Sequence, residues 1–320
     1  MKIKNVAGFL FMVYSCCCIA AKAAPADSLM SVVYGNNDGA DAKRKSLTMD
    51  IFFPQKEAGK KYPLVMLMHG GGFSTGSKEA MKGHIKILAD SGFVAVSINY
   101  RKGWNKGDNP LACEGDMEDL QLAVYRATQD ARAALRFLVE KRAEYAIDTA
   151  WIFVGGSSAG GVLALNLAYL GDEDVKKLMP AGYKALGSLD EATNNNKNTF
   201  SIKGICSMWG GLSDSTLVTP AKALPTIFYH GTADMIVPYN IGHYGTICEK
   251  YPLMFGSACM YRQTLAAGQP AVLNISEGGN HGPKEFYSKI TMSNTACFFR
   301  QVMAGTAVSN TFKDAKAGCR

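Results

Sequence analysis

Apolar segments of strand length recur along the chain, separated by segments with the period of a helix. Residues 47–53 alternate apolar and polar side chains, which predicts a half-buried strand. Residues 62–68 are almost continuously apolar, as is typical of a strand buried on both faces. Further strands are predicted at residues 93–100, 151–154, 202–209, 223–230 and 271–275.

Helical periods occupy the segments between these strands. In residues 116–142, apolar side chains recur every three or four positions, which predicts a long amphipathic helix. Within it, Asp130 and Arg132 are interpreted as structural ion partners. Shorter helices are predicted at residues 78–90 and 159–170, from about residue 238, and at 283–303.

The alternation of strands and helices predicts the fold class. It is typical of an α/β domain with a mostly parallel central sheet that helices cover on both faces. The least regular segment, residues 171–200, is interpreted as an insertion above the sheet. Because no internal repeat or linker interrupts the pattern, we expect one domain over residues 24–320.

The N-terminus has the pattern of a leader. A basic start precedes an apolar run over residues 6–21, and an Ala-x-Ala sequence ends at Ala23. This predicts a secretory signal peptide over residues 1–23 and export to the periplasm or beyond the cell. Cys16–Cys18 leave a lipoprotein anchor as an alternative. No later segment approaches the roughly 20 apolar residues of a membrane span, so we expect none after signal removal.

Composition is that of an ordinary globular protein, with 48% hydrophobic and 19% charged residues, and excludes a disordered chain. The formal net charge of +7 is spread thinly, and no basic stripe with interleaved aromatic residues occurs. We therefore expect no nucleic-acid partner.

Six cysteines follow the leader, at positions 113, 206, 248, 259, 297 and 319. An even number in an exported protein permits disulfides, although the sequence leaves the pairing open. Proximity along the chain favours Cys248 with Cys259 and Cys297 with Cys319. Cys206 lies in an apolar run and is interpreted as a reduced core residue. Because no Cys-x-x-Cys occurs, a zinc cluster is not expected, and neither a metal nor a cofactor is predicted.

Ser158 is the candidate nucleophile. It lies in a Gly-x-Ser-x-Gly sequence between Gly156 and Gly160, directly after a predicted strand and before a predicted helix. A serine hydroxyl is a weak nucleophile, so it must be exposed on a sharp turn with a base nearby. The strand–turn–helix setting favours this interpretation over a glycine-rich helix start that merely packs tightly.

An earlier glycine run supplies a second element of this chemistry. The sequence His-Gly-Gly-Gly at residues 69–72 follows the buried strand at 62–68. Acyl transfer places negative charge on the carbonyl oxygen, and backbone N–H groups aimed at that oxygen stabilise it. We predict the N–H groups of Gly71, Gly72 and Ala159 as these donors. His69 is interpreted as a brace for the loop.

The base and the acid are expected after the serine in the chain. His281 lies in a glycine-rich loop after the last predicted strand, whereas His243 falls within a predicted helix. His281 is therefore the predicted base. Asp234 follows a predicted strand that ends at His230, and it is the predicted acid that fixes the His281 tautomer. His230 is assigned a role in shaping the acid turn.

Two rival carboxylates remain open for the acid. Asp214 follows the strand predicted at 202–209, and Glu277 is close to His281 in the sequence. Asp214 could equally be a surface carboxylate or a substrate contact.

Together these motifs resemble the esterase and lipase branch of the α/β-hydrolase superfamily that carries His-Gly-Gly-Gly, including hormone-sensitive-lipase-like and bacterial feruloyl-esterase-like enzymes. The resemblance extends from about Leu47 to Phe299 and is carried by residues 69–73, 92–97, 100–101, 126–137, 156–161 and 230–238. It implies Ser158, Asp234 and His281 as a catalytic triad. Ser157 departs from the pattern, because many hormone-sensitive-lipase-like members have an acidic residue there.

The function predicted from the sequence is serine-dependent hydrolysis of carboxylic esters, either short-chain or carbohydrate-linked. An oligopeptidase-type serine peptidase is an alternative, because the turn at residues 230–234 is similar to that of such enzymes. A binding protein on a hydrolase fold is the other alternative. Candidate residues for the substrate pocket are Phe73, Trp104, Ser157 and Trp209. The sequence does not predict the oligomeric state.

Overall fold

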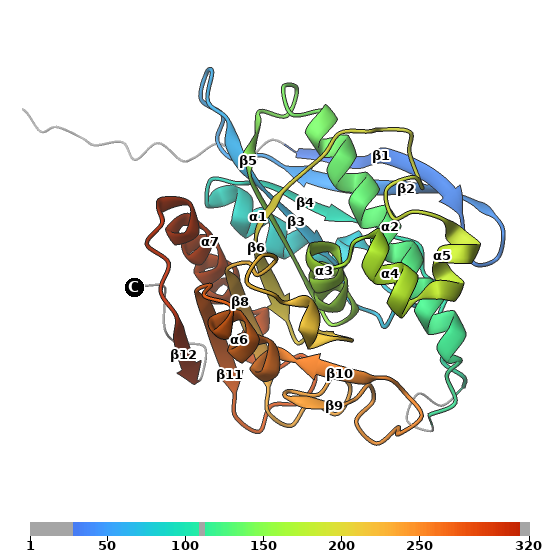
Figure 1. Cartoon of the computed structure of the whole chain (residues 1–320). Helices are drawn as coiled ribbons and strands as arrows, with labels where there is room; N and C mark the ends of the chain where they lie inside the picture. Colours follow the sequence, from blue (N-terminus) through green and yellow to red (C-terminus); the bar gives the residue numbers. More distant parts are fainter. Residues whose placement is uncertain (1–27, 109–112, 314–320) are drawn as a thin grey trace, which may run out of the picture.

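A computed structural model describes residues 28–108 and 113–313 (Figure 1). The predicted signal peptide and Cys16–Cys18 lie outside the described residues. A nine-stranded sheet runs through the molecule in the order β1-β2-β4-β3-β5-β6-β8-β11-β12. The strands are β1 (Ser28–Asp38), β2 (Arg44–Phe52), β3 (Tyr62–Met68), β4 (Val94–Ile98), β5 (Ile147–Ser157), β6 (Ile202–Met208), β8 (Thr226–Gly231), β11 (Ala271–Ser276) and β12 (Asn310–Lys313).

Most of the sheet is parallel. β1 pairs with β2, and β2 with β4, in antiparallel register, whereas all pairs from β4 to β12 are parallel. The predicted strands are therefore confirmed, with ends shifted by a few residues. The edge strands β1 and β12 were not predicted. Because parallel strands end at the same edge, the loops that follow β3, β5, β8 and β11 gather there.

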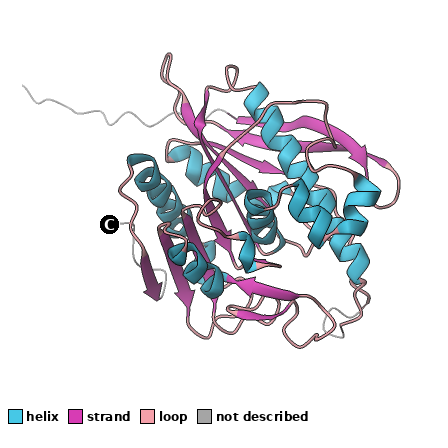
Figure 2. Cartoon of the chain, viewed as in Figure 1, coloured by secondary structure: helices cyan, strands magenta, loops and turns pink. Residues whose placement is uncertain are grey.

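Helices cover both faces of the sheet (Figure 2). α2 (Met117–Glu140), α3 (Ala159–Tyr169) and α6 (Ser257–Ala266) contribute to one apolar cluster, and α1 (Lys82–Asp90) and α7 (Lys289–Ala304) to the other. Along β3, Leu64 and Met66 belong to the first cluster and Val65 to the second, which explains the continuous apolar run. Among the described residues, no helix is both long and apolar enough to cross a membrane.

The helix predicted from about residue 238 is wrong. Residues 241–243 form β9 (Ile241–His243), which pairs with β10 (Leu253–Gly256), and β10 pairs with β7 (Gly211–Leu212). His243 therefore lies on a strand. Gly242 within β9, and Gly245 and Pro252 between β9 and β10, interrupt any helical run, and the next helix, α6, begins at Ser257.

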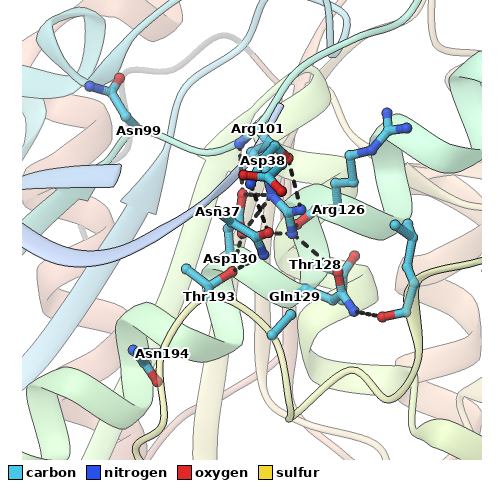
Figure 3. Close-up of polar contacts among 12 residues, drawn as sticks. Asn37, Asp38, Asn99, Arg101, Arg126, Thr128, Gln129, Asp130, Thr193 and Asn194 are labelled. Atoms are coloured by element: carbon cyan, nitrogen blue, oxygen red, sulfur yellow. Dashed lines mark hydrogen bonds and ion pairs between the residues drawn. The ribbon is translucent and has the colours of Figure 1, made fainter. Parts of the chain in front are cut away.

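The insertion at residues 171–200 is anchored against α2 and contains two short helices, α4 (Asp172–Leu178) and α5 (Pro180–Leu186). Figure 3 shows part of this anchor, in which the fully buried Asp130 of α2 accepts hydrogen bonds from Arg101 and from Thr193 of the insertion. A buried carboxylate is tolerated only when it is paired in this way. Arg132 forms an ion pair with Asp190 at 2.6 Å, so both predicted ion partners are found in ion pairs.

The disulfide pairing differs from the one predicted. Cys113 is bonded to Cys248, and Cys259 is a free, buried thiol, so the predicted Cys248–Cys259 bond is wrong. The bond that forms joins the loop after β4 to the segment between β9 and β10, two regions 135 positions apart in the sequence. Cys206 is free and buried, as expected. Cys297 is disulfide-bonded, but Cys319 lies outside the described residues, so that pairing stays a prediction.

Candidate active site

Ser158 occupies the turn between β5 and α3. Its backbone has φ 54° and ψ −121°, a conformation that is strained for a residue with a side chain and typical of a turn held for function. Ser158 N donates to Met208 O of the neighbouring strand β6 at 2.9 Å, which fixes the turn against the sheet. The hydroxyl is thereby presented at the edge where the parallel strands end.

Gly160 is required by the packing of this turn. A Cβ atom on Gly160 would lie 2.0 Å from Met68 O of β3, far inside van der Waals contact. The backbone of α3 therefore approaches β3 more closely than any side chain permits. This explains the second glycine of the Gly-x-Ser-x-Gly sequence.

Replacing Gly160 by alanine is expected to destabilise the protein by about 3 kcal/mol, because the clash is with rigid backbone. The free energy of unfolding from urea titration measures the effect. Gly83 in α1 is the matched control, since a Cβ there meets nothing within 4 Å. Gly83→Ala should leave stability unchanged or raise it by up to about 1 kcal/mol. Equal stabilities for the two variants would contradict this account.

His281 and Asp234 meet Ser158 from the loops after β11 and β8. His281 Nε2 lies 2.7 Å from Ser158 Oγ, and His281 Nδ1 lies 2.7 Å from Asp234 Oδ2. Ala233 N donates to Gly279 O at 2.9 Å, which ties the two loops together. The three residues predicted from chain order therefore form one continuous hydrogen-bonded series.

Asp234 is surrounded by donors. Its side chain is fully buried; Oδ1 accepts from the N–H groups of Ile236 and Val237, and Oδ2 lies 3.1 Å from His230 Nε2. Burial would raise the pKa of Asp234, but the hydrogen bonds from His230 and His281 outweigh it and lower the pKa to about 2. Asp234 is thus ionised at neutral pH and accepts the Nδ1 proton of His281.

His230 stabilises the turn that carries Asp234 by contacting it from the buried side. Its ring is fully buried, with Nε2 facing Val237 O at 3.0 Å as well as Asp234, and Nδ1 lying 2.8 Å from Ser257 Oγ. Because Nε2 faces only acceptors, it carries the proton, and Nδ1 accepts from the Ser257 hydroxyl. This arrangement agrees with the structural role expected from the sequence.

The rival carboxylates are engaged elsewhere. Asp214 Oδ1 accepts hydrogen bonds from Thr216 N at 2.9 Å and from its hydroxyl. Glu277 forms an ion pair with Lys313 at 2.9 Å. Within the two described ranges, no group of three His, Cys, Asp or Glu side chains could hold a metal ion.

The glycine loop after β3 lies beside Ser158. A Cβ on Gly70 would be 3.3 Å from Ser158 Cβ, and Gly71 has φ +112°, which favours glycine. Among the described residues, the N–H groups of Gly71, Gly72 and Ala159 donate to no protein acceptor. They therefore remain available to an oxygen bound near Ser158.

His69 supports this loop. Its buried ring stacks on Tyr100 with centroids 4.3 Å apart, and the Tyr100 hydroxyl donates to His69 O at 2.7 Å. Burial lowers the pKa of His69 to about 4, so the ring is neutral near pH 7. Its position is that of the brace expected from the sequence.

A cavity of about 610 Å³ opens next to the site, between α2, α3, the insertion and the segment that carries β9 and β10. Phe73, at the end of the glycine loop, and Val162, one turn after Ser158, belong to its wall. The rest of the wall is formed by Met117, Glu118, Leu120, Gln121, Val124, Asn166, Leu178, Met179, Ser213, Tyr244, Lys250, Pro252 and Met254.

Of the four predicted pocket residues, only Phe73 lines this cavity. Trp104 is buried behind it, packed edge-on against Tyr244. Trp209 is buried in the apolar cluster on the opposite face of the sheet, where it contacts Phe286. Ser157 is buried at the end of β5. None of these three contributes to the wall.

Sequence reasoning missed most of the cavity. Val162 and Asn166 carried a usable signal, because they follow Ser158 at intervals of four along one helix. The other wall residues come from segments whose packing against α3 cannot be inferred from their own pattern.

Comparison with known proteins places the chain in a family. The BD-FAE family model matches residues 49–221, which is more than half of the chain. The chain therefore belongs to the BD-FAE family. This is a family of α/β-hydrolase esterases.

Solved structures support the same fold for this BD-FAE member. A "truncated form of carbohydrate esterase from gut microbiota" superposes with a TM-score of 0.60 at 17% identity and covers 87% of this chain and 96% of its own. Esterase 2 of Thermogutta terrifontis, phosphorylated by paraoxon, gives 0.59 at 18% identity, with 89% and 96% covered. The predicted α/β-hydrolase fold is thereby confirmed.

Curated relatives are similar over a shorter stretch. A non-reducing polyketide synthase of Penicillium brasilianum is 34% identical over 142 residues, which is 43% of this chain and 5% of that protein. Methylphloroacetophenone synthase of Cladonia uncialis is 34% identical over 126 residues, covering 38% of this chain and 5% of its own length. The chain thus spans about one twentieth of the length of these relatives.

Proposed function

We propose that this BD-FAE member hydrolyses esters through an acyl-enzyme on Ser158, with His281 as general base and acid and Asp234 as its orienting carboxylate. The observation that carries the proposal is the hydrogen-bonded series from Ser158 Oγ through both His281 nitrogens to Asp234 Oδ2, each contact 2.7 Å long. Both distances are within hydrogen-bonding reach for proton transfer.

In the first half of the reaction, Ser158 Oγ attacks the ester carbonyl carbon as His281 Nε2 takes the hydroxyl proton. The carbonyl oxygen becomes an oxyanion, and the N–H groups of Gly71, Gly72 and Ala159 stabilise it. His281 then gives the proton to the leaving alcohol, and the bond between the carbonyl carbon and the alcohol oxygen breaks. Asp234 stays ionised throughout and stabilises the His281 cation.

In the second half, water replaces the alcohol. His281 Nε2 removes a proton from the water as its oxygen attacks the acyl carbon. The tetrahedral intermediate collapses, Ser158 Oγ recovers the proton, and the carboxylic acid leaves. The same groups serve both halves, so no cofactor is needed.

We propose short-chain or carbohydrate-linked esters as the substrates. Among proteins of similar fold, one is a carbohydrate esterase from gut microbiota, one is described as a bifunctional GH43-CE of Bacteroides eggerthii, and one is an esterase with propionate bound. These proteins share only 17–19% identity with the chain and support the proposal by analogy.

Covalent labelling tests the nucleophile directly. A fluorophosphonate probe is expected to attach to Ser158, and peptide mass spectrometry should locate the modification in the peptide that contains it. The paraoxon-phosphorylated esterase of similar fold supports the choice of an organophosphorus reagent. Labelling at another residue, or hydrolysis of aminoacyl nitroanilides in preference to p-nitrophenyl acetate, would contradict the proposal.

A further inference from the structure

Two polar side chains without a protein partner lie over the glycine loop. A Cβ atom built on Gly72 would be 3.1 Å from Lys106 Nζ and 3.6 Å from Tyr244 Oη. Lys106 comes from the loop after β4 and Tyr244 from the segment between β9 and β10, so the two groups approach one glycine from distant parts of the chain. Because Gly72 is a predicted oxyanion donor, both groups lie next to the reacting carbonyl of the proposed mechanism.

The Lys106 ammonium has no counter-ion. Within the two described ranges it forms no hydrogen bond and no ion pair, and the acidic residues of its own loop, Asp108 and Glu114, are not paired with it. Its contact is with the Trp104 ring, whose centroid is 5.9 Å from Lys106 Nζ. Partial burial lowers the pKa of Lys106. A partly buried cation without a counter-ion is unfavourable in the folded protein, so an anion that binds beside it is stabilised.

The Tyr244 hydroxyl is also unpaired. No hydrogen bond joins it to the part of the chain that the structure describes, although Tyr244 itself belongs to the wall of the cavity. Burial and then the charge of Asp234 raise the pKa of Tyr244, so the hydroxyl stays protonated and can donate a hydrogen bond. Neither Lys106 Nζ nor Tyr244 Oη is among the fully buried unpaired atoms of the described residues, so a bound molecule can reach both.

Trp104 fixes the two groups relative to each other. Its ring packs edge-on against Tyr244 with centroids 5.5 Å apart, and the Lys106 ammonium lies over the same ring. Trp104 N donates to Phe73 O at 3.2 Å, which ties this loop to the glycine loop. The disulfide described above joins the two segments that carry Lys106 and Tyr244. The pair is therefore held in position before a ligand binds, which lowers the entropic cost of binding.

We infer that Lys106 and Tyr244 bind a carboxylate of the substrate, so that the site selects short esters with a carboxylate a few bonds from the reacting carbonyl. The inference rests on the proposed acyl-enzyme mechanism and adds a substrate class to it. The ammonium and the hydroxyl each donate a hydrogen bond to a carboxylate oxygen. The ammonium also offsets the repulsion between that carboxylate and the oxyanion that forms at the glycine loop. A neutral ester of the same size gains neither effect.

Two matched pairs of esters test this recognition. Methyl hydrogen succinate and methyl succinamate place the charged or neutral group in the acyl part, whereas acetoxyacetate and acetoxyacetamide place it in the alcohol part. Within each pair, an amide replaces the carboxylate at nearly equal size. The quantity measured is the ratio of kcat/KM values, carboxylate over amide, from the release of methanol or acetate. For the natural protein we expect a ratio of about ten or more in one pair, and that pair identifies the part of the substrate that carries the charge.

Three variants make the comparison specific. Lys106→Met removes the charge at similar length and should lower the ratio of the preferred pair by about tenfold, and Tyr244→Phe removes only the hydroxyl and should lower it by about threefold. Lys102→Met is the matched control, because it removes the same charge from the same loop, where Lys102 Nζ donates to Gly76 O instead. Its ratio should stay within about twofold of the natural value. The amount of folded enzyme cancels in each ratio.

The inference is overturned if Lys106→Met keeps the natural ratio, or if Lys102→Met lowers it as much. It is also overturned if the natural protein hydrolyses p-nitrophenyl acetate but prefers the carboxylate in neither pair or hydrolyses neither pair. An unchanged ratio in Tyr244→Phe alone would remove the hydroxyl from the carboxylate site. Failure of the proposed function would look different, because hydrolysis of p-nitrophenyl acetate itself would then be absent or independent of Ser158.

Discussion

Replacing Ser158 by alanine is expected to lower kcat for p-nitrophenyl acetate by about 10⁴-fold or more. The variant lacks the oxygen that forms the acyl-enzyme, and His281 then has no hydroxyl to deprotonate. What remains is slow attack by water near the N–H groups of the glycine loop. Initial rates with a burst-phase assay measure the loss, since the natural protein should show acyl-enzyme accumulation and the variant none.

Ser207 provides the control for this substitution. It is a fully buried serine on the neighbouring strand β6, and its Oγ has no hydrogen-bond partner among the described residues. Ser207→Ala removes the same atom type without breaking a bond, so kcat should change less than about threefold. Retention of more than one hundredth of the natural rate by Ser158→Ala would overturn the proposed nucleophile.

The sequence predicted the central sheet and the convergence of Ser158, Asp234 and His281. Both follow from the pattern of apolar and polar residues within single strands and helices. The apolar run of β3 and the period of α2 follow directly from burial. Ser158, Asp234 and His281 each follow a predicted strand, and parallel strands end at one edge. Their convergence therefore follows from topology.

What the sequence did not predict depends on packing between distant segments. Cys248 is near Cys259 in the chain, yet it pairs with Cys113, because the fold brings the loop after β4 against the segment between β9 and β10. Gly245 and Pro252 of that segment carried a turn signal that the helix prediction did not take into account. Trp209 was placed in the pocket by its aromatic character, whereas it directly follows β6 with φ 39° and packs into the apolar cluster on the opposite face of the sheet.

The cavity illustrates the same limit. Its wall combines the start of α2, one stripe of α3, the insertion and the segment with β9 and β10. None of these segments has a sequence pattern that by itself predicts a binding surface. Asn166 looks like an ordinary helix residue in the sequence, and only the packed structure reveals that its amide oxygen is buried without a hydrogen-bond partner in the described part of the chain.

Replacing Asp234 by asparagine is expected to lower kcat by about 10⁴-fold while the protein stays folded. The two N–H groups of Ile236 and Val237 require an acceptor at the Oδ1 position, so the amide oxygen will occupy it. The NH₂ group must then face His281, whose Nδ1 becomes the acceptor and whose Nε2 carries the proton. In that tautomer, His281 cannot accept the proton of Ser158.

Asp214→Asn is the matched control for that substitution, because it makes the same chemical change in the rival carboxylate. Asp214 caps the short helix at Ser215–Leu217 through Thr216 N, and asparagine serves equally well in this position. Its kcat should therefore stay within about twofold of the natural value, measured with p-nitrophenyl acetate at equal concentrations of folded protein. If Asp214→Asn lost activity and Asp234→Asn kept it, the acid would have to be reassigned. Equal losses of kcat in both variants would instead indicate general destabilisation, and the tautomer argument for Asp234 would fail. A comparison of the thermal unfolding of the two variants would detect such destabilisation.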